Sequence, residues 1–470
     1  MLRNLVGRFS LPKISSFRSF SSIYERHEPF YPIPGVSAKE TDNPDEAFQS
    51  IKSGSKVFIQ GAAATPSLIA EKFYNYVKKN NLRDIKVYHI HTEGEYYFNR
   101  PEDEGIFRSV SLFTGSHCRK AINEGRADYV PIFLSQIPSL FREGHIELDL
   151  ALISISPPDR HGFSSLGPSI DVTRAACQNA KCIVAQSNSH LPLTRGDASI
   201  HTSHVNYVMK GNMPLHQMKI KPINEVEMQI GKNIAENLVV DGATLQMGIG
   251  SIPDAVLSQL SNHKDLGIHT EMFSDGLVDL VGKGAITNAK KKLGQGKIIS
   301  SFVMGTNKTF DFMDNNPLVE MRDIAWVNNP VVVAQNPKVT AINSCIEVDL
   351  TGQVCSDSIG PRIYSGFGGQ LDFIRGAAIC EDGKGKPIIA LPSVTKKNET
   401  KIVPTLKPGG GVVCTRAHVH YVVTEHGIAY LFGKTLSQRA HALINIAHPD
   451  HRETLEKQAF EILKIMPSPN

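Results

Sequence analysis

The stretch KVFIQGAAATPSLIAEKFYNYVKK (residues 56–79) has the pattern of a buried strand, a glycine-containing turn and a helix. Its apolar run ends just before Gly61, and the helical pattern occupies residues 67–79. Further strand-like runs lie among helical stretches, at residues 85–91, 148–156 and 181–188. Alternation of this kind is typical of βαβ units, so the N-terminal half predicts a mainly parallel sheet.

A second series of the same kind occupies the other half of the chain. The 470 residues suffice for two or three domains. Residues 210–225 contain Pro214 and Pro222 and show little hydrophobic periodicity, which is typical of a linker. Beyond them the pattern predicts a helix, a strand, a helix and a strand, at residues 225–238, 243–250, 251–260 and 265–272. We therefore predict an α/β fold of two similar open-sheet domains, residues 23–220 and 221–470.

Residues 1–22 have the composition of a mitochondrial transit peptide. Four basic residues are spaced among apolar residues and serines, and the first acid is Glu25. Lys13 and Arg18 interrupt the apolar run that a secretory signal would need. We expect the protein in the mitochondrial matrix, and the alternative is a disordered basic tail.

Charge, hydropathy and cysteine usage narrow the functional classes. The formal net charge is +4 and residues 1–22 carry four basic residues without an acid, so the rest of the chain is neutral, which argues against a nucleic-acid partner. No stretch reaches the ~18 uninterrupted apolar residues of a membrane span. The seven cysteines are scattered without a C-x-x-C pair, which fits reduced thiols and indicates neither a disulfide framework nor a zinc ribbon.

The segment LQMGIGSIPDAV (245–256) places Gly248 and Gly250 between a predicted strand and a predicted helix. Backbone N–H groups at such a junction can approach an anionic ligand, so a phosphate or pyrophosphate fits this turn. The alternative is that the glycines serve only to turn the chain. The segment matches neither the dinucleotide-binding glycine motif nor a P-loop.

The segment GIHTEMFSDG (267–276) brings Glu271 to the end of a predicted strand. Ligands of open parallel sheets bind at the carboxyl ends of strands, which makes Glu271 a candidate functional carboxylate. An ionised carboxylate can attack an activated acyl carbon without a partner base. A solvated surface glutamate is the alternative.

The segment YSGFGGQLDFIRGA (364–377) gathers Gly366, Gly368 and Gly369 within four positions, ahead of the polar residues Gln370, Asp372 and Arg375. Consecutive glycines allow a close approach of the backbone, and their amides can hold an oxyanion. A tight turn or a bulge in a strand is the alternative.

Other types of active site find little support in the sequence. No G-x-S-x-G motif of a serine hydrolase occurs. The histidine pairs in HTSH (201–204), HVH (418–420) and HPDH (448–451) match neither H-E-x-x-H nor a Cys/His zinc spacing, so we predict no metal site. A cysteine nucleophile such as Cys380 stays open.

In their order and spacing, the three motifs resemble the acetyl-CoA hydrolase/transferase family of class I CoA-transferases. LPLTRGDASIH (191–201) and KIVPTLKPGGGVVCTRAHVHYVVTEHGIAYL (401–431) resemble the same family, so the likeness runs from about residue 30 to the end. The motifs IPDAV and HTEMFSDG are most similar to those of the 4-hydroxybutyrate CoA-transferase branch. Ser251 and Asp254 depart from the asparagine-containing glycine loop of the hydrolase and acetate:succinate branch.

The resemblance implies two related α/β domains with the active site between them, commonly in a homodimer. It implies that Glu271 is the catalytic glutamate that becomes a glutamyl-CoA thioester. Residues that would bind CoA by this likeness are Gln246, Met247, Gly248, Ile249, Gly250, Gly366, Gly368 and Gly369, the last two also beside the reacting carbonyl. Lys396 and its neighbour Lys397 are further candidates for the CoA phosphates, with solvation as their alternative.

The expected activity is therefore transfer of CoA from a short-chain acyl-CoA, acetyl-CoA in the first place, to 4-hydroxybutyrate, butyrate or succinate. A ping-pong route through Glu271 exchanges one thioester for another, so neither ATP, a metal nor a prosthetic group is required. A short-chain acyl-CoA hydrolase using the same site is the first alternative. A CoA-binding protein without activity is the second.

Overall fold

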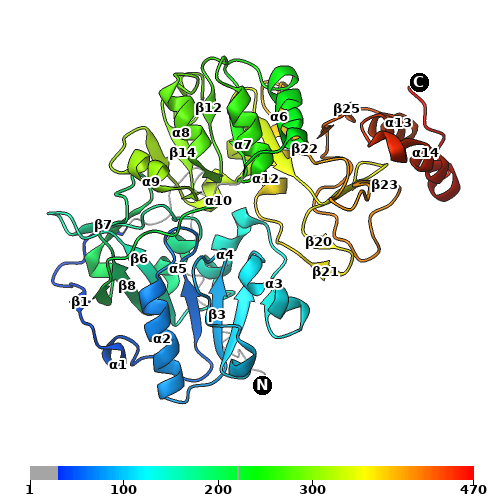
Figure 1. Ribbon diagram of the computed structural model, residues 1–470. Coiled ribbons are helices and arrows are strands. Elements are labelled where there is room, and N and C mark those ends of the chain that lie inside the picture. Colours follow the sequence, from blue (N-terminus) through cyan, green and yellow to red (C-terminus); the bar gives the residue numbers. More distant parts are fainter. Residues whose placement is uncertain (1–29, 220–221) are drawn as a thin grey trace, which may run out of the picture.

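The computed structural model describes residues 30–219 and 222–470, which form two α/β domains (Figure 1). The predicted transit peptide, residues 1–22, lies outside the described residues, and so does the predicted domain boundary at 220/221. Among the described residues, no helix combines the length and the apolar character needed to span a bilayer.

The N-terminal domain contains an eight-stranded sheet in which every neighbouring pair is parallel. In spatial order its strands are β1 (Lys39–Glu40), β10 (Tyr207–Lys210), β8 (Ile183–Ser187), β6 (Leu150–Ile155), β2 (Lys56–Ile59), β3 (Ile85–His89), β4 (Phe107–Ser111) and β5 (Asp128–Tyr129). Its helices are α1 (Pro44–Ala47), α2 (Ser67–Lys79), α3 (Ser116–Asn123), α4 (Ile137–Arg142) and α5 (Thr173–Asn179), with 3₁₀ turns η1 (Pro101–Asp103), η2 (Leu134–Gln136) and η3 (Thr202–His204). The predicted parallel sheet is confirmed.

The C-terminal domain contains a six-stranded sheet that is parallel except for its last strand. In spatial order the strands are β12 (Gly267–Ile268), β11 (Thr244–Met247), β17 (Thr340–Ser344), β22 (Lys386–Ala390), β24 (Tyr421–Thr424) and β25 (Gly427–Tyr430). Its helices are α6 (Glu225–Asn237), α7 (Ser251–Gln259), α8 (Asp275–Gly282), α9 (Asn307–Met313), α10 (Ile324–Val327), α11 (Pro330–Ala334), α12 (Gln370–Ala378), α13 (Leu436–Asn445) and α14 (Pro449–Leu463). Helices α13 and α14 lie at the edge of this domain beside β25 (Figure 1).

Smaller strands complete the two domains. They form the pairs β7–β9 (Phe163–Ser165, Ser199–His201), β13–β15 (Met272–Phe273, Phe302–Val303), β14–β16 (Ile298–Ser300, Val319–Met321) and β20–β21 (Ser358–Ile359, Arg362–Ile363), and the group β19–β18–β23 (Val354–Cys355, Glu347–Asp349, Ile402–Val403).

Both large sheets are covered on both faces, which explains why their strands are almost continuously apolar. Side chains of a strand alternate between its two faces. In β2, Phe58 packs into one core with Phe141, whereas Val57 and Ile59 pack into another with Phe73 of α2. All of these side chains are at most 1% exposed, so the short strand is specified by burial on both sides.

The order of strands reverses at one place in each sheet. In the N-terminal sheet, β3 lies on one side of β2, and the chain later adds β6 on the other side of β2. In the C-terminal sheet, β12 lies on one side of β11, and the chain later adds β17 on the other side of β11. Ligands of open α/β sheets bind outside the carboxyl ends of the strands at such a reversal. The turn with Gly248 and Gly250 follows β11 directly and therefore lies at this position in the C-terminal domain.

The continuous strand predicted for residues 265–272 is wrong. The structure has β12 at Gly267–Ile268 in the six-stranded sheet and β13 at Met272–Phe273 paired with β15. Residues 269–271 connect the two strands, with only a single bridge between His269 and Ile299. The apolar pattern does not reveal this change of partner, because both short strands are buried.

Candidate active site

Glu271 lies at the break between β12 and β13, and its backbone is firmly held. The carbonyl oxygen of Glu271 accepts hydrogen bonds from the N–H groups of Ser301 and Phe302, both at 3.0 Å, and from the Ser300 hydroxyl at 3.1 Å. Three donors on one carbonyl fix the peptide at the break. The side chain of Glu271 is only partly exposed and points into a polar group of the C-terminal domain.

Two donors contact the Glu271 carboxylate. The Asn328 side-chain amide donates from Nδ2 to Oε2 at 2.9 Å, and the Gly369 backbone N–H donates to the same carboxylate. A Cβ added to Gly369 would overlap both the carboxylate oxygen and the Asn328 amide nitrogen. Only glycine therefore permits this approach of backbone to carboxylate.

The surroundings make Glu271 a weaker acid than an ordinary glutamate. Burial raises the pKa of the Glu271 carboxyl to about 7, and the nearby Asp372 carboxylate adds to the rise, against the opposing hydrogen bonds from Asn328 and Gly369. Near neutral pH a substantial fraction of Glu271 is therefore ionised. A partly desolvated carboxylate is a better nucleophile than a fully hydrated one, because less water has to leave before it reacts.

Asp372 is the second carboxylate of this group. It lies in the first turn of α12 and is 5% exposed. Burial raises the pKa of Asp372 to about 6, although hydrogen bonds from Ser135 and Asn328 oppose the rise. Asn328 Nδ2 lies 2.9 Å from Glu271 Oε2 and 3.5 Å from Asp372 Oδ2, so one amide group stands between two acids.

The glycine segment 366–369 is a loop and not a bulge in a strand. It ends in a turn at Gly368 and Gly369 that leads into α12, with Gly369 as the N-cap residue. A Cβ on Gly366 would lie 3.0 Å from two atoms of Phe113, and one on Gly368 would lie 3.2 Å from the Phe113 ring. The Gly368 carbonyl also accepts from the Leu134 N–H at 3.0 Å. Both contacts come from the N-terminal domain, so this loop lies where the two domains meet.

The stretch 246–250, predicted to bind CoA, lies at the carboxyl end of β11. Gln246 Oε1 accepts from Asn343 Nδ2 of β17 at 2.9 Å, and the Met247 carbonyl accepts from the Thr270 hydroxyl at 3.0 Å. Ile249 packs beside Met272, the neighbour of Glu271. The structure thus brings this stretch next to the Glu271 segment.

The two glycine positions of this stretch differ in whether the backbone conformation excludes other residues. Gly250 has φ +124°, a conformation that side-chain-bearing residues rarely adopt. Gly248 has no such φ, and a Cβ there would meet no atom of residues 30–219 and 222–470 within 4 Å. No atom in this part of the chain therefore requires a glycine at position 248.

Lys396 lies on an exposed turn that follows β22, closed by a bridge between Val394 and Thr400. Strand β22 is the second neighbour of β11, so the turn emerges from the same edge of the sheet as Gly248. No contact places Lys396 in the Glu271 group among the described residues. Lys397 shares its exposed turn.

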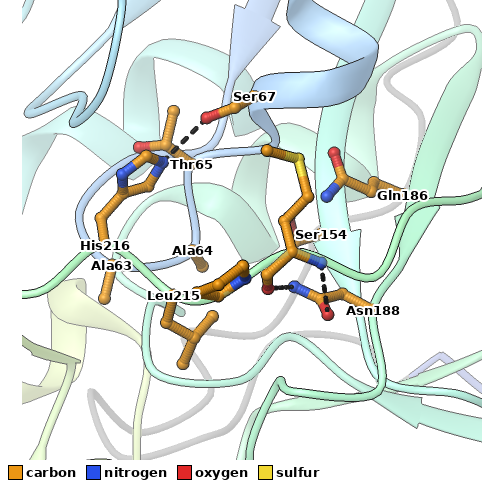
Figure 2. Close-up of a pocket in the computed structure, with 11 residues that line it drawn as sticks. Ala63, Ala64, Thr65, Ser67, Ser154, Gln186, Asn188, Leu215 and His216 are labelled. Carbon is orange, nitrogen blue, oxygen red and sulfur yellow. Dashed lines mark hydrogen bonds between the residues drawn. The ribbon is translucent and has the colours of Figure 1, made fainter. Parts of the chain in front are cut away.

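The N-terminal domain contains two polar side-chain pairs of its own. His91 Nε2 lies 2.7 Å from Glu93 Oε1. Ser67 Oγ lies 2.8 Å from His216 Nε2 (Figure 2). The cavity beside Ser67 and His216 measures about 10 Å³, which is room for about one water molecule. It cannot hold an acyl group as it stands.

The structure argues against Cys380 as a nucleophile. All seven cysteines are buried and free of disulfides. Burial raises the pKa of the Cys380 thiol to about 11, and that thiol donates to the Asn336 carbonyl at 3.3 Å. A protonated buried thiol is inert near neutral pH. Within residues 30–219 and 222–470, no three His, Cys, Asp or Glu side chains are grouped so that they could hold a metal ion.

Sequence reasoning missed Asn328 and Ser135. Asn328 is 57 residues from Glu271 and ends the short helix α10, in a run of two asparagines before Pro330 that is typical of any helix boundary. Ser135 is 237 residues from Asp372. No local pattern distinguishes either residue, whereas Asp372 was already part of a recognised motif.

Comparisons with known proteins agree with this arrangement. Residues 38–216 match the model of the acetyl-CoA hydrolase/transferase N-terminal domain, and residues 305–459 match that of the acetyl-CoA hydrolase/transferase C-terminal domain. The two matches together cover more than half of the chain.

Individual relatives are similar over most of their length. The chain is 70% identical to a succinyl-CoA:acetate/propanoyl-CoA:succinate CoA transferase of Fasciola hepatica, covering 94% of this chain and 92% of the relative. It is 45% identical to a 4-hydroxybutyrate coenzyme A transferase of Clostridium kluyveri, covering 87% and 95%. An acetyl-CoA hydrolase of Candida albicans is 24% identical, with 83% of each chain covered. The crystal structure of RipA from Yersinia pestis superposes with a TM-score of 0.86 at 34% identity, covering 91% of this chain and 98% of that chain.

Proposed function

The chain belongs to the acetyl-CoA hydrolase/transferase family and is an enzyme of the CoA-transferase class, and we propose that Glu271 carries the transfer as a glutamyl-CoA thioester. The proposed exchange joins a short-chain acyl-CoA with a small carboxylate. Succinate, acetate and propanoate are the first candidates, because the Fasciola hepatica relative is named for them. 4-Hydroxybutyrate is a further candidate acceptor, because the Clostridium kluyveri relative is named for it. Acetyl-CoA as donor and butyrate as acceptor rest on the family resemblance of the motifs.

The observation that carries the proposal is the environment of Glu271. A partly buried carboxylate with two convergent donors and a raised pKa has the properties of a nucleophile rather than of a surface charge. The two donors can stabilise negative charge on the oxygens of Glu271. The reaction requires this because Glu271 alternates between a carboxylate and an acyl group.

The proposed chemistry proceeds by two acyl exchanges. A Glu271 oxygen attacks the carbonyl carbon of the acyl-CoA, the C–S bond breaks, and a mixed anhydride and CoA thiolate result. The thiolate then attacks the Glu271 carbonyl carbon of the anhydride, which releases the first carboxylate and leaves the glutamyl thioester. A second carboxylate reverses both steps, so thioester bonds are conserved and the kinetics are ping-pong.

Asn328 and Gly369 would act in the second of these exchanges. When the thiolate attacks the glutamyl carbon, negative charge develops on an oxygen of Glu271 itself. Because both donors already contact this carboxylate, they are placed to stabilise the oxyanion there. Loss of one such donor typically costs ~3 to 4 kcal/mol of barrier.

CoA would approach along the carboxyl edge of the six-stranded sheet. Neither packing nor the backbone φ requires glycine at position 248, which supports a role in admitting a ligand close to the backbone. The amides at the start of α7 favour an anionic group, and Lys396 on the neighbouring turn is a candidate for a CoA phosphate.

The test is to trap the intermediate. Incubation with succinyl-CoA or acetyl-CoA, followed by hydroxylamine or borohydride and peptide mapping, should modify Glu271 alone. Glu271→Gln should abolish both modification and exchange, whereas Glu456→Gln, at an exposed position of α14, should change neither. Modification at another residue would refute the proposal.

Hydrolysis of acetyl-CoA is the second candidate function, favoured by the hydrolase relative. The two activities differ in their acceptor. For a transferase, added carboxylate accelerates loss of the donor and produces a new acyl-CoA. For a hydrolase, the rate does not respond and free CoA accumulates.

We also propose the mitochondrial matrix as the location and a homodimer as the assembly. The basic, acid-free segment 1–22 supports the first. Fusion of residues 1–22 to a fluorescent protein should direct it to mitochondria, and replacing its four basic residues by glutamine should leave it in the cytosol. The homodimer follows from the family resemblance and is tested by the molar mass in solution.

A further inference from the structure

One segment of the N-terminal domain, residues 134–142, holds the Glu271 group from the other side. Its Leu134 N–H donates to the Gly368 carbonyl at 3.0 Å, and its Arg142 forms a largely buried ion pair with Asp323 at 2.6 Å. Asp323 caps the start of α10, the helix that ends at Asn328. The segment thus flanks both elements that supply donors to Glu271.

Between these two contacts, Ser135 binds Asp372 with both of its donors. The Ser135 hydroxyl donates to Oδ1 at 2.8 Å and the backbone N–H donates to Oδ2 at 3.2 Å. Because both oxygens of Asp372 are engaged, the plane of its carboxylate is fixed. One oxygen, Oδ2, thereby remains directed at the Asn328 amide nitrogen.

The hydrogen bonds determine which way the Asn328 amide faces. Its NH₂ group has two acceptors, Glu271 Oε2 and Asp372 Oδ2, while its Oδ1 is buried and has no hydrogen-bond partner among the described residues. A flipped amide would direct its carbonyl oxygen at two carboxylates. Leaving Oδ1 unpaired is therefore the cost of presenting a donor to Glu271.

We propose that Ser135 and Asp372 are positioning residues, which lock the Asn328 amide with its NH₂ group toward Glu271. The inference rests on the proposed function of Glu271 and adds to it a part supplied by the other domain. Ser135 fixes Asp372, Asp372 supplies the second acceptor for Nδ2, and Asn328 then offers a donor rather than an acceptor to the reacting carboxylate. Neither residue contacts the substrate in this scheme.

The scheme separates the acceptor role of Asp372 from its charge. In Asp372→Asn, the new amide oxygen can replace Oδ2 as the acceptor for Asn328 and for the Ser135 N–H, and its NH₂ group can donate to the Ser135 hydroxyl. In Asp372→Ala the Oδ2 acceptor for Asn328 is lost, and the Asn328 amide is free to turn. The asparagine variant should therefore rescue what the alanine variant loses.

The experiment measures kcat, KM for the acyl-CoA, and the single-turnover rate of Glu271 thioester formation, together with unfolding by denaturant. Matched controls are Asp349→Ala, which removes a buried aspartate from the end of β18 outside this group, and Ser139→Ala, which removes a hydroxyl one turn along from Ser135. Ser135→Ala is the milder variant that keeps the test valid if Asp372→Ala folds poorly.

We expect kcat and the thioester rate to fall about 100-fold in Asp372→Ala, comparable to the loss of an oxyanion donor, with KM unchanged. Ser135→Ala should lose about 5-fold, as for one neutral hydrogen bond. Asp372→Asn should stay within about 5-fold of the wild type at its optimal pH, and the controls should match the wild type in kcat.

Three results would overturn the inference while leaving the function of Glu271 intact. They are a kcat in Asp372→Ala and Ser135→Ala equal to that of their controls, a rise in KM without a fall in kcat, and an Asp372→Asn variant as slow as Asp372→Ala. Absence of any trapped thioester at Glu271 in the wild type would instead refute the proposed function.

Discussion

The two glycine loops of the C-terminal domain differ in how closely other protein atoms surround their glycines. At Gly369 a side chain would collide with Glu271 and Asn328, and at Gly366 it would crowd Phe113. At Gly248 and Gly250 an added Cβ would meet no atom of the part of the chain that the structure describes within 4 Å, and only the φ of +124° at Gly250 demands glycine. The loop 366–369 is thus shaped by contacts within the protein, whereas the loop 248–250 keeps open space beside its backbone.

This difference implies that the two loops should respond differently to the same substitution. Added methyl groups in the loop 366–369 must displace protein atoms, so stability and catalysis should fall together. At Gly248 an added methyl group displaces nothing of the protein, so any effect must come through the ligand. Alanine substitutions therefore test which loop supports the catalytic group and which loop contacts CoA.

The largest effect is expected for Gly369→Ala. The methyl group would push apart Glu271 and its Asn328 donor, so kcat should fall about 100-fold or more. The free energy of unfolding should fall by about 1 to 3 kcal/mol because the site is tightly packed. Steady-state kinetics and denaturant unfolding measure the two changes.

Gly282→Ala, at the end of α8, is the matched control, because a Cβ there meets no atom of the described segments within 4 Å and its φ is not positive. It should leave kcat unchanged. A Gly369→Ala variant with kcat equal to that of this control would show that the loop 366–369 does not carry the catalytic group.

The pH dependence of kcat/KM should show an acid limb near pH 7. Burial raises the pKa of Glu271 to about 7, and Glu271 must be ionised to attack. Activity is therefore present above this pKa and falls about tenfold per pH unit below it. The same profile is expected with different donors, since it reports the free enzyme.

Asp372→Asn sharpens this prediction. The negative charge of Asp372 contributes to the raised pKa of Glu271, whereas Asn328 and Gly369 act in the opposite direction and are unchanged by the substitution. Removing the charge should lower the pKa of Glu271 and move the acid limb to lower pH. A limb below pH 5 in the wild type, or one that does not move in this variant, contradicts the expectation.

Gly366→Ala should have an intermediate effect. The new methyl group would lie 3.0 Å from the Cα and Cδ2 atoms of Phe113, and a backbone atom cannot move as easily as a side chain. We expect a loss of about 1 to 2 kcal/mol in the free energy of unfolding. A double-mutant cycle with Phe113→Ala should show coupling between the two positions, and strictly additive effects would place the strain elsewhere.

The smallest effect is expected for Gly248→Ala. The free energy of unfolding should change by less than about 0.5 kcal/mol, since no protein atom is displaced. KM for the acyl-CoA should rise about 5-fold, as for the loss of one hydrogen bond. KM for the carboxylate acceptor serves as the internal control and should stay constant. A destabilised variant with normal KM would assign this loop to the fold instead.

Much of the fold follows from local sequence patterns. The helix predicted at 67–79 coincides with α2, and the strands predicted at 148–156 and 181–188 contain β6 and β8. These elements are specified by apolar residues buried on both faces of a sheet, which a short window reveals. The strand predicted at 265–272 failed because pairing partners, not hydropathy, divide it into β12 and β13.

The candidate site likewise contains residues that local sequence patterns reveal and residues that they do not. Glu271 and the glycines of both loops stand out in short motifs, because strand ends and close backbone approaches leave local signatures. Asn328 and Ser135 leave none. An asparagine at a helix end and a serine in a 3₁₀ turn occur throughout proteins, and their importance here depends on contacts spanning 57 and 237 residues.

The order of residues along this chain was therefore enough to specify strand–turn–helix units, their grouping into two α/β domains, and a carboxylate between two glycine motifs, since each depends on interactions over a few residues. Folding added the break in the strand at Glu271, the pair of donors on its carboxylate, and the contact by which Ser135 of one domain reaches Asp372 of the other. These features depend on which distant segments pack together, and long-range packing arises from the summed burial of both domains rather than from any one stretch of sequence.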